Sequence, residues 1–240
     1  GANVLNGVTC TSATQCIGVG YDDVGVGQPQ ALIETWDGTT WTVTPSPSTG
    51  SDPSRLNSVA CGFVAGITAP SAASDYCVAV GLEDSGGGAQ ALIETGTGGT
   101  WTVTPNPGGS SSALNGVSCG LQTPFCVAVG WTLVDGTARA LIETSTGEGP
   151  WALGASANVG NADNVLNGVS CPSTNTCVAV GFDGAPGATQ SLVEALSGTT
   201  WVDFAGPEEG HGHNVFDGIG DNVLNAVSCT TTFLSLIHIS

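Results

Sequence analysis

Short apolar stretches recur along the chain, separated by runs rich in Gly, Ser, Thr and Pro. Each stretch has five to seven residues, and its Val, Ile, Leu, Thr and Trp content is typical of β-strands. Helical spacing of Leu, Glu, Lys and Arg is missing, so the pattern predicts an all-β chain. Adjacent apolar residues such as Leu32 and Ile33 would face opposite sides of a sheet, which predicts sheets that are covered on both faces.

The apolar stretches repeat in a fixed order. The phrase VLNGVTC and its near-copies place a Leu at positions 5, 56, 114, 166 and 224, spaced by 51, 58, 52 and 58 residues. Four times this phrase is followed by CVAVG-like, ALIET-like and WTVTP-like phrases. Four short strands per unit of about 50 residues is the pattern of a β-propeller blade. We therefore expect an open or incomplete ring of four-stranded antiparallel blades at about 3–45, 55–107, 113–155 and 165–205, with the first strand of a fifth at 223–233.

Small residues occupy fixed places in the repeat. The residue after Leu-Asn is always small, and these positions are Gly7, Ser58, Gly116, Gly168 and Ala226. We expect the first strand of each blade to crowd the central axis, where small residues let backbones approach. The second phrase ends in Gly, which predicts a positive φ in the following turn, at Gly20, Gly81, Gly130 and Gly181.

Two larger residues also repeat once per unit. A Trp begins each fourth phrase and is predicted to anchor blade to blade, with ligand stacking as the alternative, at Trp41, Trp101, Trp151 and Trp201. A Glu ends or nearly ends each third phrase, at Glu34, Glu94, Glu143 and Glu194. Its regular recurrence predicts one structural hydrogen bond made in every blade, because catalysis requires an asymmetric site.

The turn between the third and fourth phrases carries a family resemblance. The stretch TWDGTTW resembles the Asp box Ser/Thr-x-Asp-x-Gly-x-x-Trp of bacterial-neuraminidase propellers through Thr35, Asp37, Gly38 and Trp41, with one residue fewer between Asp and Gly. The other three turns keep Gly and Trp but lack the Asp. The phrases also resemble repeats of secreted actinobacterial proteins and of photosystem-assembly-factor-like propellers. This resemblance covers residues 3–229 and implies the fold more specifically than any activity.

Nine cysteines follow the repeat. Eight form one pair per unit at the ends of the first and second strands, which predicts four hairpin-closing disulfides: Cys10–Cys16, Cys61–Cys77, Cys119–Cys126 and Cys171–Cys177. The rival interpretation, zinc binding, requires a second pair or a His nearby, and each pair belongs to a different blade. Disulfides in series predict an oxidising compartment, so we expect a secreted, periplasmic or cell-surface protein.

Charge restricts the partners. The chain has 20 acidic residues, two Arg, no Lys and a net charge of −18, which disfavours nucleic acid and anionic lipid surfaces. No apolar run reaches the roughly 18 residues of a membrane span, so we expect no membrane insertion. The acidity fits a self-repelling soluble surface or a cation-binding one. We expect no cofactor, with Ca²⁺ or another divalent cation as the alternative, and the candidate ligands are His211, His213 and Asp217.

Two classes of function follow. The first is a non-catalytic binding or scaffold module that recognises a glycan or a protein. The alternative, implied by the resemblance, is a fragment of an Asp-box glycoside hydrolase. Sialidases of that class bind the substrate carboxylate with an arginine triad, which Arg55 and Arg139 alone cannot build.

The end of the chain breaks the repeat. After VLNAVSC a second Cys is expected, but LSLIHIS follows and leaves Cys229 unpaired. This string resembles translated sequencing-adapter read-through of metagenomic reading frames, so residues 234–240 are expected to be a non-native tail. The repeat then belongs to a larger ring of five to eight blades, and the open edges of this chain are expected to self-associate.

Overall fold

A computed structural model of the chain is all-β, as the sequence predicts. The structure describes residues 3–23, 28–47, 52–63, 75–97, 99–120, 125–146, 149–184, 189–205, 223–229 and 234–238. Within these ranges every regular element is a strand, and no helix is present that is long and apolar enough to cross a bilayer.

The strands form four antiparallel sheets of four strands each, and every strand pairs with its neighbour in sequence. The first sheet contains β1 (Asn3–Ser12), β2 (Gln15–Asp23), β3 (Pro29–Trp36) and β4 (Trp41–Thr44). The second contains β5 (Ser54–Phe63), β6 (Asp75–Asp84), β7 (Ala89–Thr97) and β8 (Thr100–Val103). The third contains β9 (Ser112–Cys119), β10 (Phe125–Val134), β11 (Thr137–Thr146) and β12 (Ala152–Gly154). The fourth contains β13 (Asn164–Ser173), β14 (Thr176–Asp183), β15 (Gln190–Ser197) and β16 (Thr200–Ala205).

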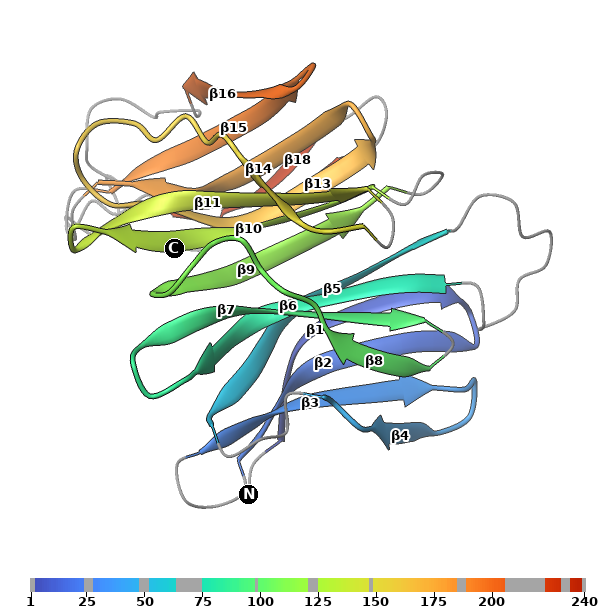
Figure 1. Ribbon diagram of the computed structural model, residues 1–240. Coiled ribbons are helices and arrows are strands. Elements are labelled where there is room, and N and C mark those ends of the chain that lie inside the picture. The colour runs from blue at the N-terminus through green and yellow to red at the C-terminus, as the bar shows by residue number, and fades with distance from the viewer. Residues whose placement is uncertain are drawn as a thin grey trace.

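These sheets are propeller blades arranged in an open arc. Figure 1 shows them following one another from β1–β4 at the bottom to β13–β16 at the top. The core is divided into clusters that lie between successive blades. Between the first two blades, Val19 and Ile33 of one sheet meet Leu56 and Val59 of the next. Both faces of an inner blade are therefore buried, which explains the adjacent apolar residues of the third strand.

The first strands of successive blades lie side by side and are joined by a ladder of asparagines. Each Asn of the Leu-Asn pair donates from Nδ2 to the carbonyl of the Leu in the next blade. These bonds measure 2.8–3.1 Å and link Asn6 to Leu56, Asn57 to Leu114, Asn115 to Leu166, and Asn167 to Leu224. The small residue after the Asn permits this approach: a Cβ added at Gly116 would lie 3.1 Å from the Cα of Gly168.

The glycines that end the second phrase have a different role from the one predicted. Gly20, Gly81, Gly130 and Gly181 lie inside the second strands and are not among the positive-φ residues. Each lies beside a bulge in the first strand, where the register shifts by one residue. An added Cβ there would overlap a carbonyl oxygen of that strand, for example that of Arg55 at Gly81. Close backbone approach, and not a left-handed turn, explains these glycines.

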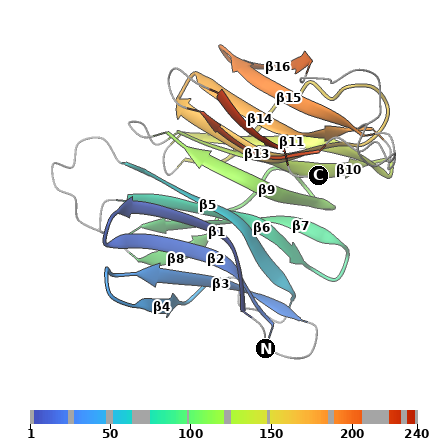
Figure 2. The same ribbon diagram turned by 180° about the vertical axis from the view of Figure 1, so that it is seen from behind.

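A fifth sheet of two strands follows the fourth blade. It contains β17 (Leu224–Cys229) and β18 (Leu234–His238), and Figure 2 shows its red strands beside β13 and β14. Leu224 and Val227 cover Val180 and Val193 of the fourth blade. We expected only the first strand of a fifth blade, but residues 234–238 pair with β17 where a second strand belongs. The foreign origin of residues 234–240 stays a prediction.

Candidate functional site

The eight paired cysteines form four disulfides, one in each blade: Cys10–Cys16, Cys61–Cys77, Cys119–Cys126 and Cys171–Cys177. Their Cα atoms are 4.0–4.1 Å apart, because the first and second strands bring them opposite one another. Cys229 is a free thiol, and Leu234 stands opposite it in the register. Partial burial raises the pKa of the Cys229 thiol.

The predicted metal ligands His211, His213 and Asp217 lie in 206–222, outside the described residues. Among the residues that the structure does describe, no group of three or more His, Cys, Asp or Glu side chains is placed to hold a metal ion.

Two of the four repeated glutamates, Glu94 and Glu194, connect their blade to the linker that enters it. Ser46, in the linker after the first blade, donates from Oγ to Glu94 Oε1 of the second blade at 2.8 Å. The matching Ser156 donates to Glu194 Oε1 at 2.6 Å, and the Ala157 amide donates to Glu194 Oε2 at 3.2 Å. Both carboxylates are fully buried at separate blade boundaries. These hydrogen bonds hold each linker against the blade that follows it, which is a structural role.

Glu143 occupies the same place in the third blade but lacks the serine. Asn106 stands there instead, and it turns back to its own blade by donating to the Ala91 carbonyl at 2.6 Å. Its Oδ1 accepts the Gly108 amide at 2.8 Å. The fully buried Glu143 carboxylate has no hydrogen-bond partner among the described residues. Burial raises the pKa of Glu143 to about 7, although the polar Gly108 backbone nearby opposes this shift.

Asp37 closes the turn that resembles the Asp box. Its carboxylate accepts the amides of Thr39 and Thr40, both at 2.8 Å, and also both of their hydroxyl groups. These hydrogen bonds hold the pKa of Asp37 well below its usual range, with the Thr39 hydroxyl the largest cause. This Asp acts on the hairpin turn itself and is fully exposed to solvent.

Three of the four repeated tryptophans anchor a blade to the blade before it. Trp101, Trp151 and Trp201 are 4–7% exposed, and each joins the cluster that contains residues of the preceding sheet. Trp41 is 44% exposed, because no sheet precedes the first blade in the structure. Its ring centroid lies 5.7 Å from that of Trp36.

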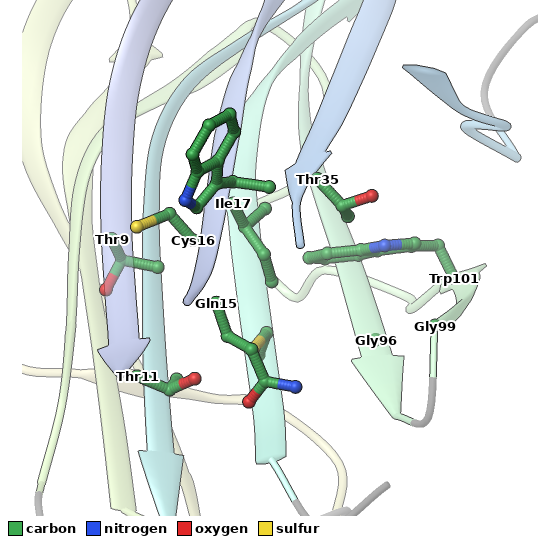
Figure 3. Close-up of a pocket in the computed structure, with 11 residues that line it drawn as sticks. Thr9, Thr11, Gln15, Cys16, Ile17, Thr35, Gly96, Gly99 and Trp101 are labelled. Carbon is green, nitrogen blue, oxygen red and sulfur yellow. The ribbon is translucent and has the colours of Figure 1, made fainter. Parts of the chain in front are cut away.

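A pocket of about 130 Å³ opens between the first and second blades. Polar side chains of the first blade line it, namely Thr9, Thr11, Gln15 and Thr35. Its apolar wall comes from Ile17, Trp36, Trp101 and the disulfide cysteines Cys16 and Cys77. Figure 3 shows the Trp101 ring extending from β8 toward Ile17, with Thr9, Thr11 and Gln15 on the opposite side. None of the described residues that line this pocket has a charged side chain.

One small residue of the pocket lining, Gly96, differs from its counterparts in the other blades. The position after the third phrase is Trp36 in the first blade, Gly96 in the second, Ser145 in the third and Leu196 in the fourth. Leu196 packs against the cluster between the third and fourth blades, and the Ser145 hydroxyl donates to the Gly149 carbonyl. At Gly96 an added Cβ would lie 2.8 Å from the Trp101 ring, so the ring packs directly against the Gly96 backbone. The difference between Gly96 and its three counterparts is the signal in the sequence that points to this site.

A second hollow lies beside the first and shares Gly99 and Trp101 with it. Its other lining residues are Pro45, Ser46, Pro47 and Thr100, and its volume is about 310 Å³. Trp101 therefore contributes to the walls of both hollows.

Comparison with protein-family models finds no match to this chain, and neither does comparison with curated proteins.

Proposed function

We propose that this chain is a non-catalytic binding module that acts outside the cytoplasm and recognises a neutral saccharide between its first and second blades. The observation that carries this proposal is the uncharged pocket walled by Trp36 and Trp101 and lined by hydroxyl and amide side chains. A pyranose ring has an apolar face that contacts aromatic side chains, and hydroxyl groups that bond to Thr and Gln.

The size and charge of the pocket support one sugar ring. Sites for drug-sized ligands span roughly 300–1,000 Å³, so 130 Å³ corresponds to a single ring-sized group. The adjoining hollow at Pro45 and Pro47 offers space for a further residue of an oligosaccharide. With a net charge of −18 on the chain and no basic residue in the lining, an anionic sugar is disfavoured.

The position of the carboxylates supports a module more than a hydrolase. Glycoside hydrolases of the usual type need two carboxyl groups about 5–9.5 Å apart on either side of the scissile bond. Glu94 and Glu194 are engaged with linker serines at different blade boundaries, and Glu143 lies at a third. The four disulfides support a location in an oxidising compartment, which we propose to be the cell exterior or the periplasm.

The test is a glycan array followed by calorimetry, beside a turnover screen with the same saccharides. Binding without turnover is expected. Thr11→Val and Gln15→Leu each remove one hydrogen-bonding group from the pocket and should weaken binding about fivefold, since a net hydrogen bond is worth about 1 kcal/mol. Thr176→Val, at an exposed position of β14 in the fourth blade, is the matched control and should bind as the wild type does. Unchanged binding in both pocket variants overturns the site, and sugar release overturns the class.

A further inference from the structure

The first blade exposes a set of apolar side chains that every later blade buries. Leu5 is 49% exposed, whereas the matching Leu56, Leu114, Leu166 and Leu224 are 0–3% exposed. Val8 is 65% exposed, whereas the matching Val59, Val117 and Val169 are 7–9% exposed. Trp41 shows the same contrast with the other three blade tryptophans. We call Leu5, Val8, Gly18 and Trp41 the head face.

The head face is continuous. A Cβ added at Gly18 would lie 3.4 Å from Leu5 Cδ1 and 3.5 Å from Trp41 Cζ3, so these residues adjoin on one side of the sheet. None of the four is charged. In the second, third and fourth blades, the matching surface packs on the second and third strands of the preceding blade. The fifth sheet does the same through Leu224 and Val227. The chain thus uses one interface four times and presents one half of it again.

The first strand of the other half of this interface is present at the far end of the arc, in β17 of the two-stranded fifth sheet. On the first strand, the position of Ser58 points toward the following blade, because its Oγ accepts the Val117 amide at 3.3 Å. In β17 this position is Ala226. The position of Ser170, whose Oγ accepts the Cys229 amide at 3.0 Å, becomes Ser228. We call Ala226 and Ser228 the tail face.

We propose that the head face binds the tail face of a second copy of this chain, in the same register as the blades within one chain. In that register Ser228 Oγ of one copy accepts the Cys10 amide of the next. The Leu5 carbonyl occupies the place of the Leu carbonyls that accept from the asparagine of the preceding blade. Small residues permit the contact, because Ala226 would lie beside Gly7 and Val8 as Ser58, which also carries a Cβ, lies beside Gly116 and Val117. The association is head-to-tail, so it continues from copy to copy until a ring closes.

The net charge of the chain opposes this association and makes it depend on salt concentration. Each copy carries a net charge of −18, so two copies repel at low ionic strength. Salt screens this repulsion but leaves the burial of Leu5, Val8 and Trp41 favourable. Association is therefore expected to strengthen as salt concentration rises.

The experiment is analytical ultracentrifugation of the full chain at several concentrations and salt levels. The wild type should gain average mass with concentration, while Val8→Asp and Ala226→Asp should each remain at the mass of one chain. An equimolar mixture of these variants should give a complex of two chains, because one keeps a free tail and the other a free head. Leu153→Asp, which changes an exposed apolar residue on β12, is the control and should associate as the wild type does.

Each other outcome contradicts the proposal. A wild type that stays at the mass of one chain at high salt shows that the head face is not self-complementary to the tail. Association of Ala226→Asp alone would mean that two head faces meet. Failure of the mixture to form a two-chain complex excludes the head-to-tail register. Pairing in the mixture also shows that the Ala226→Asp chain is folded, because it must supply an intact head face.

Discussion

Ser46, in the linker after the first blade, donates its hydroxyl hydrogen to Glu94 Oε1 of the second blade at 2.8 Å, and both side chains are buried. This bond fixes the linker between the first two blades, beside Trp101 and the second hollow. The same connection recurs between Ser156 and Glu194, so the repeated Glu of the third phrase acts on the chain entering its blade.

Ser46→Ala should destabilise the protein by about 1–3 kcal/mol. The substitution leaves the buried Glu94 carboxylate without this donor, and hydrogen bonds to charged groups contribute about that much. Urea unfolding followed by tryptophan fluorescence measures the change. Ser173→Ala removes an exposed hydroxyl from the end of β13 and should stay within about 0.5 kcal/mol of the wild type.

Glu143 should make the stability fall as pH rises. Its pKa is about 7 in the folded protein against 4.5 for a free carboxyl, so the folded state holds this proton more tightly. Below pH 4.5 the group is protonated in both states, so its ionisation adds no cost to folding. Above pH 7 it is ionised in both states, and burying the charge costs roughly 3 kcal/mol. Glu143→Gln should therefore be more stable than the wild type at pH 8, with the gap closing between pH 7 and 4.5.

Urea unfolding of both proteins at several pH values tests this dependence, because other titrating groups cancel in the difference. Asp52→Asn, which removes an exposed acid, is the control and should change the unfolding free energy by no more than about 0.5 kcal/mol. A pH-independent gap for Glu143→Gln would mean that Glu143 is ionised or solvated throughout.

The repeat made the architecture predictable, because each phrase is a strand and each pair of cysteines marks a hairpin. The contacts that a residue makes across the blade boundary were harder to predict from the sequence. The Asn of every Leu-Asn pair was visible in five copies, but its acceptor is a backbone carbonyl at least 50 residues away. Sequence alone gives no sign of such a partner, since any residue offers a carbonyl.

The candidate site shows the same limit. Gly96 differs from Trp36, Ser145 and Leu196 at the same place in the repeat, so the asymmetry itself was readable. Whether neighbouring side chains would fill the resulting space depends on packing, and here Trp101 does so only in part. The glycines at the end of the second phrase were correctly singled out, but for the wrong physical reason.

Gly81→Ala should be strongly destabilising, by roughly 3 kcal/mol, because the new Cβ would overlap the Arg55 carbonyl oxygen beside a bulge. The strand pair must separate or lose its register to admit one methyl group. Gly87→Ala is the matched control in the same blade: nothing lies within 4 Å of its added Cβ, and it has no positive φ. Thermal unfolding should place this control near the wild type, and equal effects of the two substitutions would refute the steric explanation.

The loss of unfolding free energy on removing one disulfide should increase with the length of the loop that the disulfide closes. Cys61–Cys77 spans 16 residues and Cys171–Cys177 spans six. Constraining the unfolded chain then contributes about 3 kcal/mol for the longer loop and about 2 kcal/mol for the shorter one. Replacing both cysteines of a pair by Ala should reproduce that order in urea unfolding, with thiol titration finding one reactive group, Cys229, in each variant as in the wild type. Because Cys171 and Cys177 are both buried whereas Cys61 is partly exposed, the reverse order would show that lost packing outweighs chain entropy at these hairpins.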